Sequence, residues 1–224
     1  MEDFKIELDL NNFDVNIEID INGKENKNPF EKLPVYKIQK TKIKTSLELA
    51  KKINLQKNER VICISHGNFI FCDFIVSLIQ EKKYEADEVI ISTLSLNSNN
   101  LAALEWAMDY GFIKNLKLII SDFWYQTNKH KFIPQMLKIM NKFEDRFSLS
   151  VCRSHTKICL IKTNGLFITI HGSANLTSSN NLEQFMIEEG EQLYKFMFDF
   201  QQTIINNFQL TKKSANRNEL FNLI

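Results

Sequence analysis

The sequence has no long hydrophobic run. No apolar stretch approaches the roughly 20 residues that a helix needs to cross a bilayer, and the opening residues, Met-Glu-Asp-Phe-Lys, do not have the pattern of a signal peptide. A membrane-spanning or secreted protein is therefore not indicated, and we expect a soluble, cytoplasmic protein.

Glycine and cysteine are scarce, with six and four residues. There is no glycine-rich loop that could cradle a phosphate and no dinucleotide-binding fingerprint. The cysteines lie in or beside apolar runs without Cys-x-x-Cys spacing, which favours buried, reduced thiols over disulfides or zinc ligands. They are Cys63, Cys72, Cys152 and Cys159. The chain also contains no internal repeat.

The sequence is rich in apolar residues, and its basic residues are concentrated in two stretches. With 224 residues, 44% of them hydrophobic and 18 of them Phe, the chain can bury one sizeable core. The net charge is only +1, but residues 114–162 hold ten Lys and Arg against three Asp and Glu, and residues 31–60 hold nine against three. We interpret the second stretch as a solvated surface. The first is either another such surface or one that faces a polyanion, and we favour the polyanion.

The first 21 residues have a strand pattern of their own. Apolar residues alternate over 4–10 and 13–21, and Asn11-Asn12 between them suits a tight turn. This predicts an N-terminal β-hairpin with one apolar face, which must pack on the main domain, on a partner or on its own copy. Residues 22–34 are predicted to be a linker, and residues 35–224 the main domain.

In the main domain, strand and helix patterns alternate, which predicts an α/β fold with a mixed β-sheet flanked by helices on both faces. The expected strands are 60–65, 88–96, 116–121, 147–152, and a hairpin of 158–161 with 166–170. The expected helices are 46–54, 68–82, one capped by Asn97 or Ser98 and ended by Gly111, one from Pro134 to Glu144, and one over 183–208 with Phe185, Leu193, Phe196, Met197, Phe200, Ile204 and Phe208 facing inward.

The hairpin separates three groups of polar residues. His155 and Lys157 precede its first strand, and Gly172, Ser173 and Asn175 follow its second. Glu183 comes eight residues later. Because alternate side chains of a strand share a face, an imidazole, an ammonium, a hydroxyl and a carboxamide can converge on one small anion.

This combination resembles the phospholipase D superfamily, whose signature is His-x-Lys, then Gly-Ser-x-Asn, then an acidic residue. The wording here is most similar to the single-motif branch found in phages and mobile elements. One departure is Lys162, which stands where the family often has Asp. The resemblance covers roughly residues 58–210 and is most specific over 153–189.

The resemblance implies a phosphodiesterase that works without a metal or other cofactor. One His attacks phosphorus, a second protonates the leaving oxygen, and water resolves the phosphohistidine. Since the chain has a single motif, the second His155 must come from another chain, which implies a homodimer with twofold symmetry. Lys157 and Asn175 would hold the phosphate oxygens. Gly172 and Ser173 would contact the substrate or hold the turn.

Glu183 has two interpretations at this stage. It could accept the second ring N–H of a histidine, or it could be a carboxylate at a helix start that interacts with backbone amides.

Other polar residues are weaker candidates. Ser65 and His66 follow a strand and could line the substrate pocket or cap a helix, and Ser95, Asn97 and Asn99 have the same status. We expect His130 on the surface. Asp122, Trp124 and Tyr125 could frame a substrate channel or belong to the core.

The function favoured by these patterns is a metal-independent phosphodiesterase, most plausibly a nuclease. Two alternatives remain. One is a phospholipid phosphodiesterase, against which the lack of a basic amphipathic helix counts. The other is a non-catalytic module with the same fold that binds nucleic acid or a partner protein.

Overall fold

The computed structural model describes residues 46–66, 69–177 and 181–210. The predicted N-terminal hairpin of residues 1–21 and the predicted linker of residues 22–34 lie outside these ranges.

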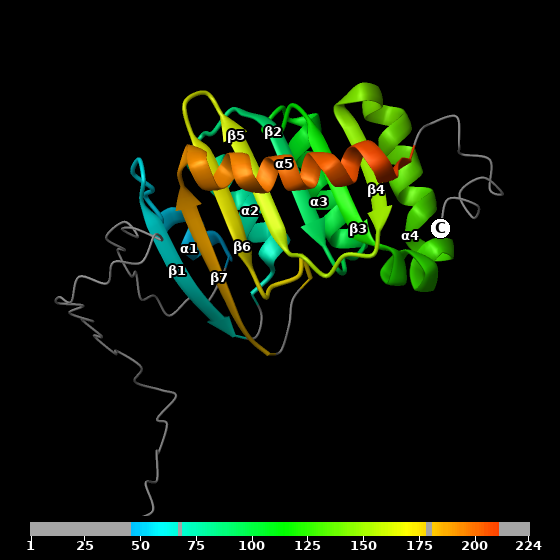
Figure 1. Cartoon of the computed structure of the whole chain (residues 1–224), viewed down its shortest axis with the longest axis horizontal. Helices are drawn as coiled ribbons and strands as arrows, with labels where there is room; N and C mark the ends of the chain where they lie inside the picture. Colours follow the sequence, from blue (N-terminus) through cyan, green and yellow to red (C-terminus); the bar gives the residue numbers. More distant parts are fainter. Residues whose placement is uncertain (1–45, 67–68, 178–180, 211–224) are drawn as a thin grey trace, which may run out of the picture.

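An eight-stranded mixed sheet forms the centre of the molecule, with the strand order β1-β7-β6-β5-β2-β3-β4-β8 (Figure 1). Strands β2, β3 and β4 run parallel, and the other neighbours pair antiparallel. The strands are β1 (Arg60–His66), β2 (Ala86–Thr93), β3 (Leu116–Ser121), β4 (Phe147–Cys152), β5 (Ile158–Thr163), β6 (Phe167–Gly172), β7 (Leu182–Glu189) and β8 (Gln209–Leu210).

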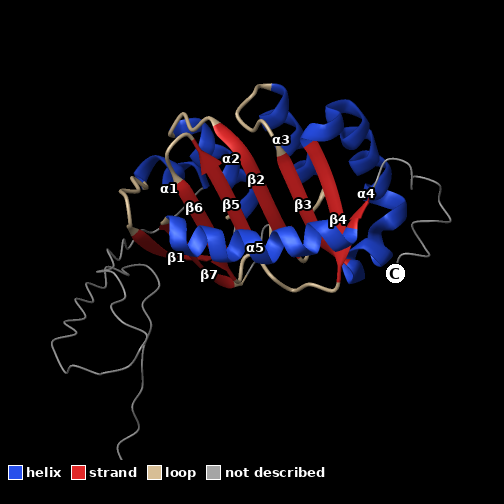
Figure 2. Cartoon of the chain, turned by 45° about the horizontal axis from the view of Figure 1, so that its top comes forward, coloured by secondary structure: helices blue, strands red, loops and turns tan. Residues whose placement is uncertain are grey.

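Helices cover both faces of this sheet. Helices α1 (Ser46–Lys52), α2 (Phe71–Glu81), α3 (Ser98–Asp109) and α4 (Asp122–Phe143) lie on one face, and α5 (Glu191–Phe208) crosses the other (Figure 2). A short 3-10 turn, Glu144–Arg146, connects α4 to β4. The predicted α/β class, with helices on both faces of a mixed sheet, is confirmed.

The alternation of β2 shows why two cores form. Val89 and Ile91 pack under α1–α4, whereas Ile90 points to the opposite face and packs near Tyr194 of α5. All three are buried, and full burial of each such side chain contributes about 1.5–3 kcal/mol. The four cysteines are free and buried, as predicted.

The predicted start of α3 is also confirmed. Asn97 accepts a hydrogen bond from the backbone N–H of Asn100, and the Asn100 side chain accepts one from the N–H of Asn97, both at 3.0 Å. This reciprocal cap satisfies two amides that the helix leaves unpaired. Beyond the helix, Gly111 has φ +75°, a conformation that favours glycine.

The prediction that a helix starts at Pro134 is wrong. Helix α4 begins at Asp122, directly after β3, and Pro134 lies in its interior. A proline within a helix removes one backbone hydrogen bond. Burial of Phe132, Ile133 and Met136 in the main core holds the helix together across this position.

The predicted helix over 183–208 is wrong in its first third. Residues 182–189 form strand β7, which pairs with β1 on one side and β6 on the other. Strand β7 makes backbone hydrogen bonds to both neighbours, and its alternate residues Phe185 and Ile187 are buried. Together these interactions outweigh the local helical pattern. Helix α5 begins only at Glu191, after Gly190.

The predicted inward face of α5 is only partly correct. Met197 and Ile204 do pack against the core under the helix, together with Tyr194 and Ile205. Phe196, Phe200 and Phe208 are instead 69%, 44% and 47% exposed.

Candidate active site

One edge of the sheet collects the residues of the predicted motif. Strand β5 begins there, β6 ends there, β7 begins there and β1 ends there, at the lower edge in Figure 1. Gly172 pairs with Phe185, and Ser65 pairs with Glu183. Since neighbouring strands are about 4.8 Å apart, this register brings Lys157, Ser173 and Glu183 to adjacent strand ends.

His155 and Lys157 contact each other directly. The Lys157 Nζ lies 3.2 Å from His155 Nδ1 and donates to the His155 carbonyl at 3.0 Å. An ammonium can only donate, so Nδ1 accepts and the ring proton lies on Nε2. A free Nε2 lone pair, which attack on phosphorus requires, therefore needs Lys157 to leave Nδ1. A bound phosphate would attract the ammonium and do this.

A chain of hydroxyl groups fixes the segment that carries both residues. Ser92 Oγ of β2 lies 2.7 Å from Thr156 Oγ1, which lies 2.8 Å from Ser154 Oγ. Ser154 Oγ also accepts from the Thr156 backbone N–H at 3.2 Å. These three positioning residues were missed by the sequence analysis. For Ser154 and Thr156, the signal is a hydroxyl residue on each side of His155. Ser92 is 64 positions from Thr156, so no local pattern points to it.

Ser173 joins the second group of motif residues to the third. Its Oγ donates to a Glu183 carboxylate oxygen in a very short contact, and it accepts from the Gln184 backbone N–H at 3.0 Å. The Ser173 backbone N–H donates to the Gln184 carbonyl at 2.8 Å. Glu183 lies in a strand, so the interpretation as a helix-start carboxylate is excluded.

Gly172 makes this close approach possible. A Cβ atom at position 172 would lie 2.2 Å from the Gln184 carbonyl oxygen and 2.5 Å from the Phe185 Cα. Both are backbone atoms of β7 and cannot yield without moving the strand. The glycine is therefore required because two backbones meet here.

We expect Gly172→Ala to destabilise the fold by about 1–3 kcal/mol, since overpacking forces β6 and β7 apart. Turnover should fall as well, because Ser173 and Glu183 shift together. Chemical denaturation and steady-state kinetics measure the two effects. Gly165, at the hairpin turn, has open space around its Cβ position but φ +102°. Gly165→Ala should therefore cost stability through backbone strain alone and leave turnover unchanged. Equal turnover losses in both variants would contradict this account.

Asn175 lies three residues beyond the end of β6, between two buried residues. Ala174 and Leu176 are buried, and the Leu176 carbonyl accepts from the backbone N–H of Cys72, the second residue of α2. The Asn175 Oδ1 is buried without a hydrogen-bond partner. Because the oxygen of this carboxamide is the buried atom, its N–H groups are the end that remains to donate to a phosphate oxygen.

The electrostatics of the site centre on Lys157. Burial lowers the pKa of its ammonium below the usual lysine value, and the Glu183 carboxylate partly offsets this. A partly desolvated ammonium interacts more strongly with an arriving phosphate than one in bulk water.

We predict an alkaline limb in the pH profile of kcat/KM. If Lys157 binds phosphate as the motif predicts, only its charged form does so, and activity is lost as the pH rises through its pKa. Because that pKa is lowered, the limb falls at a pH below that of an ordinary lysine. Lys157→Arg stays charged throughout and should lose this limb, whatever its absolute rate. An unchanged limb in Lys157→Arg would assign it to another group.

Other predicted residues lie at the site or away from it. Ser65 is buried opposite Glu183, and the backbone of His66 pairs with Leu182 at the same edge. His130 is exposed on α4, as expected. Trp124 and Tyr125 are buried in the main core, where Trp124 stacks on Phe132 at 5.2 Å, so they do not frame a channel.

The remaining candidates have structural contacts elsewhere. Ser95 accepts from the Thr93 hydroxyl at 3.0 Å through its carbonyl. Asn97 caps α3, and Asn99 is an exposed residue in the first turn of that helix. His171 lies between Ile158 and Met186, on the sheet face toward α5. Burial and then Arg60 lower the pKa of its imidazole, and Glu188 opposes them.

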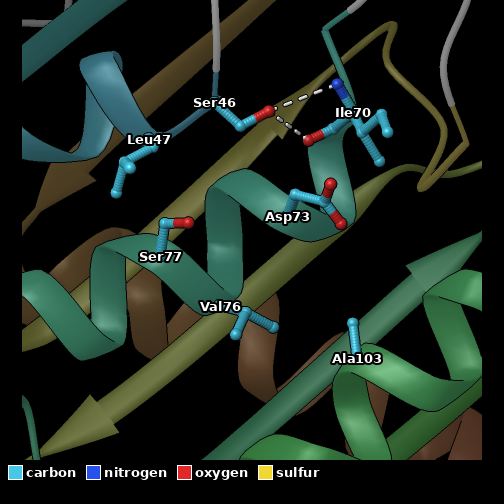
Figure 3. Close-up of a pocket in the computed structure, with 7 residues that line it drawn as sticks. All are labelled: Ser46, Leu47, Ile70, Asp73, Val76, Ser77 and Ala103. Carbon is cyan, nitrogen blue, oxygen red and sulfur yellow. Dashed lines mark hydrogen bonds between the residues drawn. The ribbon is translucent and has the colours of Figure 1, made fainter.

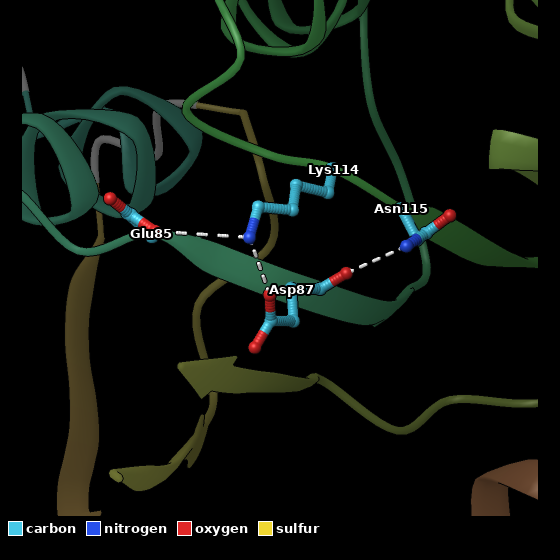
Figure 4. A network of polar contacts seen from close by, with 4 residues as sticks. All are labelled: Glu85, Asp87, Lys114 and Asn115. Carbon is cyan, nitrogen blue, oxygen red and sulfur yellow. Dashed lines mark hydrogen bonds and ion pairs between the residues drawn. The ribbon is translucent and has the colours of Figure 1, made fainter. Parts of the chain in front are cut away.

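The basic stretch of residues 114–162 is partly neutralised by carboxylates from other elements. Lys114 donates to Asp87 at 2.8 Å and lies 3.8 Å from Glu85, beside the Asn115 side chain that donates to the Asp87 carbonyl (Figure 4). Lys117 pairs with Glu88 and Lys142 with Glu105 and Asp109. The stretch is therefore not one continuous basic surface. Only its basic residues near the motif could interact with an anion bound at the motif.

A hollow of about 400 Å³ lies between α1, α2 and α3 (Figure 3). Ser46 closes one end by donating to the Ile70 carbonyl at 2.7 Å, and burial raises the pKa of Asp73 on its wall. Among the described residues, none of the motif lines it, so it is not the predicted site. The described residues also contain no group of three or more His, Cys, Asp or Glu placed to hold a metal ion.

The chain matches no protein-family model and no curated protein. Three solved structures of similar fold are phosphatidylserine synthase from Haemophilus influenzae (14% identical, TM-score 0.48, 68% of this chain and 40% of that one), polyphosphate kinase from Porphyromonas gingivalis (13%, 0.48, 66% and 26%) and NucT from Helicobacter pylori (15%, 0.48, 66% and 97%).

All three are members of the phospholipase D superfamily, the family that the motif resembles. The chain spans less than half the length of the first two. Because each identity is 15% or lower and each TM-score is below 0.5, these similarities carry no argument about substrate or reaction. In the described part of the chain, no helix combines the length and apolar character that a membrane span requires.

Proposed function

We propose that this protein is a phosphodiesterase that forms a phosphohistidine at a site shared by two subunits. The observation that carries the proposal is the contact of a partly desolvated Lys157 ammonium with Nδ1 of His155. The Ser173–Glu183 pair stands on the neighbouring strands of the same sheet edge. Together these groups offer a nucleophile, a cation and hydrogen-bond donors to one phosphate.

The reaction needs two imidazoles. The Nε2 of one His155 attacks phosphorus, and the departing oxygen takes a proton from the other His155 as the P–O bond breaks. Water then attacks phosphorus and gives a proton to the second His155, which is now neutral, as the P–N bond breaks. Lys157 and Asn175 stabilise the negative charge on the nonbridging oxygens. Glu183 accepts from Ser173 within one chain, and its second oxygen remains able to orient a histidine.

The second imidazole is drawn from a second subunit because the chain has a single His-x-Lys motif. His130 lies on the surface of α4, and His171 points to the face of the sheet toward α5. The backbone of His66 lies at the same sheet edge as the motif, so its imidazole is the alternative within one chain. A twofold axis that brings two copies of this sheet edge together places both His155 rings at one phosphate.

An exposed apolar face supports this dimer. Ile64 and Leu182 are 64% and 73% exposed. Both occupy alternate positions to Cys63 and Phe185, which are buried in the other core, so they lie on the α5 side of the sheet. Phe196 and Phe200 extend the same side along α5. Burial of this face against its own copy would remove large apolar side chains from water beside the site.

Among phosphodiester substrates, nucleic acid fits this chain better than a phospholipid. The cation of the motif is Lys157, and the exposed Arg153 precedes His155 by two residues, which suits a chain of phosphates more than a single headgroup. A non-catalytic binding module is the alternative in another class, and Lys162 does not favour it. Lys162 pairs with Glu88 and Phe167, at the far end of β5 from His155, so the missing Asp leaves the site residues themselves in place.

The test is hydrolysis of DNA, RNA and phospholipid vesicles in parallel, with an excess of chelator. We expect cleavage of nucleic acid and an acid-labile phosphoryl group on His155 after rapid quenching. A requirement for magnesium would contradict the mechanism. Binding without turnover across the pH range would favour the non-catalytic module.

A further inference from the structure

Phe123 is an exposed aromatic residue at the sheet edge that carries the site. It is the second residue of α4, directly after β3, and its side chain is 70% exposed. The following residues, Trp124 and Tyr125, are buried in the core. The backbone around the ring is thus anchored, while the ring itself has no structural role in the core.

Arg153 lies beside it. The last residues of β3 and β4, Ser121 and Cys152, pair with each other, which brings the two chain segments that follow them together. The Arg153 Nε lies 3.6 Å from Asp122 Oδ2, and the Arg153 side chain is 93% exposed. An exposed ion pair of this length contributes little, so the guanidinium remains available to another anion.

The chain between Arg153 and Lys157 connects this corner to the site. It runs from the end of β4 to the start of β5, which are separated in the sheet by β3 and β2. Ser92 at the end of β2 holds Thr156 on this path. Phe123, which follows β3, is therefore two strand spacings, about 10 Å, from the start of β5 along the edge.

We propose that the substrate is single-stranded nucleic acid, with an unpaired base stacked on Phe123 and its phosphate bound by Arg153. This inference rests on the proposed function and adds the form of the substrate. An aromatic ring can stack only on a base whose face is open, which a duplex does not offer. The strand runs along the sheet edge, and the stacked base flanks the phosphate that is cleaved at His155.

A membrane surface is the other ligand that an exposed ring near a phosphate site could meet. Membrane binding needs a broad apolar face with several large side chains. Phe123 instead follows Asp122, which lies within ion-pair distance of Arg153, and the next two aromatic residues are buried. This arrangement favours a base over lipid.

Binding of a fluorescent single-stranded oligonucleotide, measured by anisotropy in a His155→Ala background, tests the inference. We expect Phe123→Ala to weaken binding about 5- to 150-fold, Phe123→Leu to behave like Ala, and Phe123→Trp to restore affinity. Arg153→Ala should lower the slope of log affinity against log salt by about one. The matched control is Tyr110→Ala, at an aromatic residue just after α3 that is 69% exposed, and it should leave binding unchanged.

The stacking role is overturned if Phe123→Ala binds normally, if Leu works as well as Phe, or if duplex binds as tightly as single strands. If Phe123→Ala weakens binding to phospholipid vesicles but not to the oligonucleotide, Phe123 binds a membrane rather than a base. Hydrolysis of bis(p-nitrophenyl) phosphate, which has no base, is measured separately without the His155→Ala change. Absence of this turnover would refute the proposed function while the binding result still decides the role of Phe123.

Discussion

His155→Ala should abolish turnover while the fold stays intact. If His155 is both nucleophile and acid in a shared site, one substitution removes both groups, and kcat should fall by at least about 10³-fold. The side chain is exposed, so the free energy of unfolding should change by no more than about 0.5 kcal/mol. Rapid-quench labelling with a ³²P-labelled substrate should show no phosphohistidine in the variant.

The matched control for this substitution is His130→Ala. His130 is another exposed histidine, on the surface of α4, and its removal should leave kcat and the labelled intermediate unchanged. Persistent labelling of the His155→Ala protein, at His66 or His171, would show that a different imidazole attacks phosphorus and that the site is wrongly assigned.

The double substitution Phe196→Glu and Phe200→Glu should dissociate the dimer and remove activity. Both rings lie on the outward side of α5, so carboxylates there do not disturb the core of a single subunit. Burial of unpaired carboxylates in an apolar interface costs several kcal/mol, which should raise the dimer dissociation constant by at least about 100-fold. Analytical ultracentrifugation and circular dichroism separate dissociation from unfolding.

Tyr110→Glu is the control for charge on an exposed aromatic position. Tyr110 follows α3, on the opposite face of the sheet, and its substitution should leave both mass and activity unaffected. A monomeric Phe196→Glu, Phe200→Glu protein with full activity would show that one chain contains a complete site. An unchanged dimer would place the interface on another surface.

The parts of the fold that were predicted correctly have strong local signals. The β5–β6 hairpin follows from two apolar runs around Asn164-Gly165, and Gly165 has the positive φ that such a turn needs. The start of α3 follows from the Asn97 cap. The same hairpin explains why His155, Lys157 and Ser173 lie at one edge of the sheet. Strand β5 begins directly after Lys157, and β6 ends directly before Ser173.

The errors arise where distant segments decide the structure. The sequence 182–189 is extended only because β1 and β6 lie on either side of it, 124 and 15 positions away in the registers Ile62–Met186 and His171–Met186. The outward direction of Phe196 depends on which side of α5 meets the sheet. Likewise, the contact of Ser92 with Thr156 joins the end of β2 to the segment before β5 across 64 positions, and no local pattern reveals it.

Subunit mixing tests the shared site most directly. Wild-type protein is mixed with increasing amounts of His155→Ala protein under conditions of subunit exchange, and activity per wild-type subunit is measured. If two His155 side chains form each site, mixed dimers are inactive, and activity per wild-type subunit falls to about half at equal amounts and further with excess. A constant activity per wild-type subunit would contradict the account.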